Sequence, residues 1–149
     1  MYRKAICAAF FILFSMCGAA AAAGPAGENI DRASADYVEI ATAVEYYFEA
    51  GRKGDSFYMK QVFLPEANIY GISGGKIVGG PIQLLYDMVE GKPSPTEIVY
   101  RIAAVDIARD IATVRLEIAD WAGNRYIDMF TMIKGDEGWR IASKVSIKP

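Results

Sequence analysis

The sequence predicts one α+β domain, with helices packed on the concave face of a cone-shaped, curved and mainly antiparallel sheet. Helix-type apolar periodicity is confined to residues 36–90, and four strand-like segments then follow one another from residue 97 to residue 147. Helices grouped in one part of the chain and strands that follow in succession are typical of the α+β class. Such a sheet leaves a cavity beneath the first helix if side chains do not fill it.

Residues 1–23 have the pattern of a cleavable signal peptide. Arg3 and Lys4 precede an apolar run over residues 5–16, and small residues from Ala19 to Ala23 form a cleavage site. The apolar run is too short to cross a bilayer core of about 30 Å as a helix. We therefore expect cleavage after Ala23, a secreted or periplasmic protein, and no membrane attachment afterwards. Acylation of Cys17 is the alternative, but Met16 is larger than the residue expected before a lipid-modified cysteine.

Composition excludes several kinds of chemistry from the mature chain. The chain has no histidine, and its two cysteines, Cys7 and Cys17, both lie in the predicted signal peptide. Disulfides, thiol nucleophiles, histidine-based triads and typical zinc sites are therefore excluded. Of the 16 basic residues, two lie in the signal peptide, which leaves 14 against 18 acidic residues and a net charge of −4. This charge does not favour nucleic acid as a partner.

Residues 24–35 are expected to form a flexible leader, and residues 36–149 a single domain. From Asp36 the apolar residues recur at helical spacing, and Gly51 or Gly54 can end this helix. A short second helix is expected from Asp55 or Ser56 to about Phe63, where Pro65 stops it.

The later elements are predicted by alternation and turn residues. Residues 67–72 and 76–78 read as strands around a glycine turn, and residues 82–90 as a helix with Pro81 in its first turn. Four longer strands are expected at residues 97–105, 112–121, 125–134 and 139–147. The glycines in "GGKIVGG" fit a hairpin better than a phosphate-binding loop, because the required Lys-Ser or Lys-Thr ending is missing. We therefore expect no cofactor.

Three segments together resemble the nuclear-transport-factor-2-like superfamily. They are "VEYYFEAGRKGD", "FLPEANIYG" and "YIDMFTMIKGDEGWRIASKV", and the chain looks closest to the SnoaL-like, "putative lumazine-binding" branch. The resemblance runs from about Tyr37 to Ile147. It implies a cystatin-like cone, a pocket on its concave face and, in many relatives, a homodimer formed through the convex face. It does not imply one function, because members include enzymes, ligand binders and subunits without known chemistry.

One local pattern departs from that resemblance. Leu64 stands before Pro65, where relatives often carry a histidine, so the histidine–aspartate dyad of the dehydratase branch has no counterpart here. Any acid–base chemistry would need another ionisable group.

Asp128 is the candidate for that group. It shares one strand face with Tyr126, Phe130 and Met132, while the opposite face is also largely apolar. We therefore expect the strand to be covered on both sides and the carboxylate not to be freely solvated. It could act in a pocket as a general base or a ligand contact. Alternatively, it pairs structurally with a cross-strand Arg or Lys, or with a tyrosine hydroxyl.

Three tyrosines are the further candidates for a ligand site. Tyr47 lies on the apolar stripe of the first helix, Tyr100 shares a strand face with Ile98 and Ile102, and Tyr126 shares one with Asp128. A tyrosine in a cavity can stack on a planar ligand or donate to an oxyanion. Each could equally be a packing residue of the core.

Three functions follow from these candidates. The first is a non-catalytic binder of a small, largely apolar or aromatic ligand, with Tyr47, Tyr100, Tyr126 and Asp128 lining the pocket. The second is an isomerase-, dehydratase- or cyclase-type enzyme with Asp128 as general base. The third is a structural or partner-binding module with a filled cavity.

Overall fold

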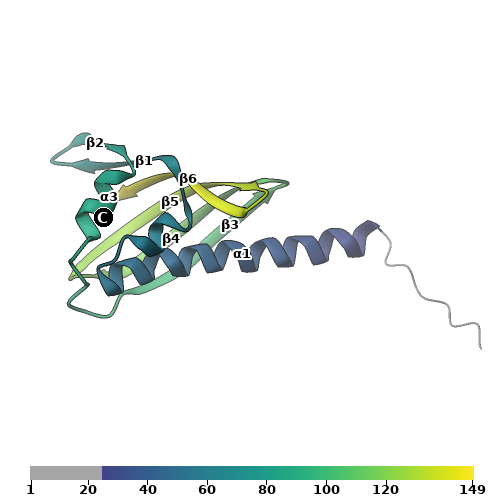
Figure 1. Ribbon diagram of the computed structural model, residues 1–149, viewed down its shortest axis with the longest axis horizontal. Helices are drawn as coiled ribbons and strands as arrows, with labels where there is room; N and C mark the ends of the chain where they lie inside the picture. The colour runs from purple at the N-terminus through teal and green to yellow at the C-terminus, as the bar shows by residue number, and fades with distance from the viewer. Residues whose placement is uncertain (1–24) are drawn as a thin grey trace, which may run out of the picture.

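A computed structural model describes residues 25–149, and the predicted signal peptide lies outside them. Three helices and six strands follow in the order α1, α2, β1, β2, α3, β3, β4, β5, β6 (Figure 1). The helices are α1 Pro25–Lys53, α2 Phe57–Lys60 and α3 Gln83–Val89. The strands are β1 Phe63–Ser73, β2 Lys76–Pro81, β3 Val99–Ala108, β4 Ile111–Trp121, β5 Asn124–Gly135 and β6 Gly138–Ile147.

All six strands form one curved sheet in the order β2-β1-β6-β5-β4-β3. Every pairing is antiparallel except that of β1 with β6, which is parallel because the chain leaves the hairpin β1–β2, forms α3 and re-enters the sheet at its far edge. The helix α1 runs along one face, while α3 and the β1–β2 hairpin lie together at one end (Figure 1). The predicted α+β architecture with a curved, mainly antiparallel sheet is confirmed.

The helix α1 begins earlier than predicted. Residues 25–35, expected as a flexible leader, are its first turns, and these turns project past the sheet (Figure 1). Pro25 suits the first helical position because its fixed φ fits the helix and its missing N–H would be unpaired there anyway. Residues 30–35 are exposed, so they carry no apolar stripe from which a helix could be recognised.

The second helix is shorter than predicted, and the first strand begins earlier. The helix α2 ends at Lys60, and β1 already begins at Phe63. Pro65 therefore lies within β1, at the irregular stretch between Phe63 and Asn68 in the pairing with β6. A proline is tolerated there because the interrupted ladder does not need its missing N–H. Pro81 likewise ends β2 rather than opening α3.

The core lies between α1 and the concave face of the sheet. Phe48 on α1 and Phe130 on β5 are among its largest fully buried side chains, and burying one such ring contributes roughly 1.5–3 kcal/mol. Strand β4 follows the predicted alternation, with Val114 and Leu116 buried and Arg115 on the outer face. Among residues 25–149, no helix combines the length and apolar character needed to cross a membrane.

Candidate functional site

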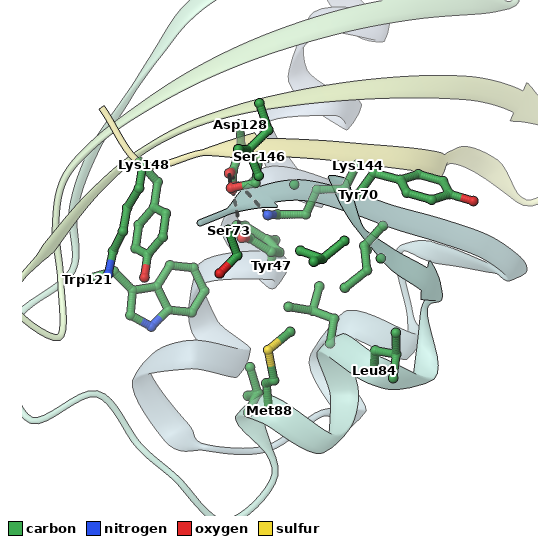
Figure 2. Close-up of a pocket in the computed structure, with 18 residues that line it drawn as sticks. Tyr47, Tyr70, Ser73, Leu84, Met88, Trp121, Asp128, Lys144, Ser146 and Lys148 are labelled. Carbon is green, nitrogen blue, oxygen red and sulfur yellow. Dashed lines mark hydrogen bonds and ion pairs between the residues drawn. The ribbon is translucent and has the colours of Figure 1, made fainter. Parts of the chain in front are cut away.

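A pocket of about 610 Å³ opens between the concave side of the sheet and α3. Strands β1, β5 and β6 supply one side, α3 supplies the opposite side, and α1 contributes Tyr47 (Figure 2). Much of the lining is apolar and includes Ile69, Leu85, Met88, Val89 and Trp121. Its volume lies within the range of small-molecule sites. The cavity is open, whereas the hypothesis of a structural or partner-binding module expected side chains to fill it.

Asp128 lies at the sheet side of this pocket and is only 1% exposed. Its Oδ2 accepts a hydrogen bond from the Tyr47 hydroxyl at 2.8 Å, and its Oδ1 accepts one from Ser146 Oγ at 2.5 Å. Lys144 Nζ lies 3.1 Å from the same Oδ1 (Figure 2). Asp128 therefore lines a cavity and is also paired with a cross-strand lysine and a tyrosine.

Tyr47 joins α1 to this cluster. It is buried, and its ring makes edge contacts with Phe48, Trp121 and Phe130 at centroid distances of 4.9, 5.3 and 5.2 Å. Burial and the neighbouring Asp128 carboxylate raise the pKa of Tyr47 well above its ordinary value. The hydroxyl therefore stays protonated at neutral pH and acts as a donor to Asp128.

Tyr126 lines the same pocket. Burial, followed by the charge of Asp128, raises the pKa of Tyr126. The structure thus places Tyr47, Tyr126 and Asp128 in the lining of one pocket.

Tyr100 is not among the residues that line the pocket, contrary to the prediction. Its ring stacks on Phe48 with centroids 3.6 Å apart, and its hydroxyl donates to Glu45 on α1. Burial and this hydrogen bond raise the pKa of Tyr100 to about 12. Tyr100 therefore packs between α1 and β3 as a core residue, the second of the two roles considered for each tyrosine.

Lys144 and Ser146 are site residues that sequence reasoning missed. Trp139 and Ile141 face the core, so strict alternation would turn Lys144 and Ser146 outward. The register with β5 shifts between Thr131 and Met132, where Ala142 has no partner. One extra residue moves all later side chains to the opposite face. The available signal was that Lys144 and Ser146 alternate with the apolar Val145 and Ile147, but no residue type marks the bulge itself.

Trp121 reaches the pocket because Gly51 leaves room for it. A Cβ at Gly51 would stand 2.3 Å from the Trp121 ring and 2.9 Å from the Ile98 side chain. A glycine is thus needed here for the close approach of β4 to α1.

Other parts of the described chain offer little alternative chemistry. Within residues 25–149, no group of three or more Asp, Glu, Cys or His side chains could hold a metal ion. A second hollow lies between α2 and the β5–β6 turn, lined by Lys60, Asp136 and Arg140 among others. The Asp128 cluster is therefore the candidate site.

A family model described as "Putative lumazine-binding" matches residues 35–146, most of the chain. The chain belongs to this family.

Solved structures of two nuclear-transport-factor-2-like proteins of unknown function agree in fold. The protein from Shewanella baltica OS155 is 34% identical, with a TM-score of 0.71 over 76% of this chain and 93% of that one. The protein from Silicibacter pomeroyi DSS-3 is 28% identical, with a TM-score of 0.73 over 78% and 98%.

A protein with a named activity is also similar to this chain. The aldolase FrzH of Cladobotryum sp is 30% identical over 113 residues, which cover 75% of this chain and 90% of that protein. Membership of the nuclear-transport-factor-2-like superfamily, in its "putative lumazine-binding" branch, supports a small-molecule-binding fold.

Proposed function

We propose that this protein is a secreted or periplasmic binder of a small, largely apolar or aromatic molecule, held between α1, α3 and the sheet. The observation that carries the proposal is a pocket of about 610 Å³ with a largely apolar lining and one polar cluster at its wall. Ligand sites of this kind use apolar surface for affinity and a few convergent polar groups for orientation.

A binding role without catalysis is supported by the surroundings of Asp128. Its two oxygens already accept hydrogen bonds from Tyr47 and Ser146, and Lys144 pairs with one of them. A general base must reach a substrate proton within hydrogen-bond distance. Three protein partners leave Asp128 little free surface for that purpose.

The test is native mass spectrometry of the protein purified from its own source. We expect a population with the mass of one small organic molecule added, which is lost on denaturation. Substituting Leu85→Trp in the pocket lining should remove that population, whereas Phe57→Trp on the exposed face of α2 should retain it. Protein that carries no ligand and also fails to bind an apolar fluorescent probe would overturn the proposal.

Secretion is supported by the pattern of residues 1–23, with its basic start, short apolar run and small-residue end. Protein recovered outside the cytoplasm should begin at Gly24. An intact Met1 in the purified protein would contradict this part of the proposal.

A homodimer through the outer sheet face is also part of the proposal. Met129 pairs with Val145 on β5 and β6, and they are 43% and 46% exposed. Exposed Ile133 and Ile147 extend this apolar surface along the same two strands. Contiguous exposed apolar side chains on a sheet face mark an interaction surface.

An enzyme is the second candidate, favoured by the aldolase among the relatives. In this reading, Asp128 removes a proton from a carbon next to a carbonyl group, as an aldolase, isomerase, dehydratase or cyclase requires. Incubation of the co-purified ligand in D₂O tests it, because proton removal and return would exchange C–H for C–D. If the protein is an enzyme, Asp128→Asn should abolish that exchange. If it is a binder, the wild type should show no exchange, and Asp128→Asn should lose only part of the ligand affinity.

A further inference from the structure

The charges that line the pocket do not balance. Two lysines, Lys144 and Lys148, face one acid, Asp128. Asp128 is also the acceptor for the hydroxyls of Tyr47 and Ser146, so its negative charge is shared among three donors. The charged side chains that line the pocket therefore carry an excess of positive charge.

Lys144 is the buried member of this pair of lysines. It is 7% exposed, and its only ion-pair partner among residues 25–149 is Asp128, at 3.1 Å. The ammonium group carries three N–H donors, and it also lies over the Tyr47 ring, 5.9 Å from the ring centroid. Asp128 can accept only part of this donor capacity, and an oxygen of a molecule bound in the pocket would supply a further acceptor.

Lys148 lies at the exposed side of the same pocket. It follows directly after β6, and its ammonium stands 5.7 Å from the centre of the Tyr126 ring. None of the ion pairs among residues 25–149 includes Lys148, whose positive charge is therefore available to attract an anion. Figure 2 shows it beside Trp121, away from the apolar side of the pocket formed by Leu84 and Met88.

We propose that the ligand is an organic acid whose anionic oxygen binds Lys144 while its apolar body packs on α3. Lys148 attracts and partly neutralises the same anion at the pocket mouth. Asp128 then acts as a positioning residue that holds the Lys144 ammonium at the wall, rather than as the group that contacts the ligand. This inference rests on the proposed function, because it names the ligand class of the same pocket.

Two fluorescent probes with one carbon skeleton test the inference. Anilinonaphthalene sulfonate carries a fixed negative charge, and phenylnaphthylamine is its uncharged counterpart. We expect the purified wild-type protein to bind the sulfonate at least ~10-fold more tightly, because a charge-assisted hydrogen bond is among the stronger polar contacts. Lys144→Met should remove that preference and change binding of the neutral probe by less than ~threefold.

Three further variants separate a specific role from damage to the fold. Lys144→Arg keeps the cation and should retain most of the preference for the sulfonate. Lys148→Met alters an exposed residue and should weaken sulfonate binding about threefold, with a smaller salt dependence. Lys92→Met removes the same charge outside the pocket and should change neither probe. Near-ultraviolet circular dichroism checks that each variant is folded, since loosely packed states also bind such probes.

The outcomes are distinguishable. If wild-type protein binds neither probe, the proposed function itself fails. If it binds the neutral probe and shows no preference for the sulfonate, only the anionic ligand is overturned. Equal loss of sulfonate binding in Lys144→Met and Lys92→Met would also overturn it, because general charge would then explain the effect.

Discussion

At the scale of single residues, Asp128 and Lys144 form a buried ion pair that is completed by two hydroxyl groups. Lys144 Nζ lies 3.1 Å from Asp128 Oδ1, and both side chains are almost fully buried. Taking two charges out of water costs free energy that their attraction only partly returns. The hydrogen bonds from Tyr47 and Ser146 offset part of that cost. Removing one partner should therefore lower the free energy of unfolding more than removing both, because a single remaining partner would be a buried, unpaired charge.

Removing the charge of Asp128 should therefore destabilise the fold. Asp128→Asn leaves the Lys144 ammonium buried without an anion, and we expect the free energy of unfolding to fall by about 3 kcal/mol. The double variant Asp128→Asn, Lys144→Met should recover part of the loss, because no unpaired charge remains. Urea denaturation measures both, with Asp106→Asn on the exposed face of β3 as a control expected to change little. Equal stabilities of Asp128→Asn and wild type would show that the pair is not buried in solution.

At the scale of elements, two contacts fasten α1 to the sheet at opposite ends of its buried stretch. Near its start, Asp36 accepts a hydrogen bond from Lys134 Nζ at 2.5 Å and one from Trp139 Nε1 at 3.1 Å. Near its end, Gly51 packs against Trp121. Between these contacts, α1 presents Tyr47 to Asp128. The position of the helix thus determines the shape of the pocket.

The contact at Asp36 predicts a loss of stability in acid. The hydrogen bond from Lys134, together with the one from Trp139 and the positive charges of Lys134 and Arg32, outweighs the effect of burial and lowers the pKa of Asp36. A carboxylate with a lowered pKa in the folded state contributes stability above its unfolded pKa of about 3.9, and this is lost as pH falls through the lower folded value. Urea denaturation at pH 7 and at about pH 3 should show a smaller acid loss for Asp36→Asn than for wild type. An identical loss in Asp36→Asn would contradict this assignment.

The contact at Gly51 predicts a change in the pocket wall. In Gly51→Ala the new Cβ would clash with the Trp121 ring, and displacing that ring should cost about 1–3 kcal/mol of stability. The better helix propensity of alanine offsets only about 1 kcal/mol of this. We expect shifted tryptophan fluorescence and weaker binding of the neutral probe. Gly135→Ala, where a Cβ meets nothing within 4 Å, is the matched control. Unchanged fluorescence in Gly51→Ala would mean that Trp121 does not pack there.

The elements also show why the sequence predicted the fold better than the site. Apolar periodicity determines which strand faces are buried, so the burial of Leu116 on β4 followed from alternation. The face of Asp128 on β5 did not, because both faces of that strand are largely apolar in the sequence. The bulge at Ala142 depends on how β6 meets β5, which no local pattern records, and it alone turns Lys144 into the pocket. The prediction for Tyr100 was wrong for a different reason. Its side chain lies on the inner face of the sheet, but Phe48 of α1 covers it, so it does not reach the pocket.

At the scale of the whole molecule, the pocket and the proposed dimer surface lie on opposite faces of one sheet. On β5, the side chain of Asp128 points into the pocket, while that of Met129 points outward next to Val145. A partner on the outer face would cover apolar side chains without closing the pocket. It would also stiffen β5 and β6, the strands that supply Asp128, Lys144 and Ser146. Ligand affinity should then depend on the oligomeric state through the rigidity of these strands.

Breaking the proposed dimer tests this arrangement. Met129→Glu places a charge in the centre of the apolar outer face, and burying it against a partner would be costly. We expect light scattering coupled to size-exclusion chromatography to show a dimer for wild type and a monomer for Met129→Glu. Val38→Glu adds the same charge at an exposed apolar position on α1 and should remain dimeric. The monomer should still bind the neutral probe, because its pocket residues are intact. Its affinity should be lower by a few-fold, because β5 and β6 are no longer stiffened by a partner. A monomeric wild type, or a dimer that persists in Met129→Glu, would show that this face is not the interface.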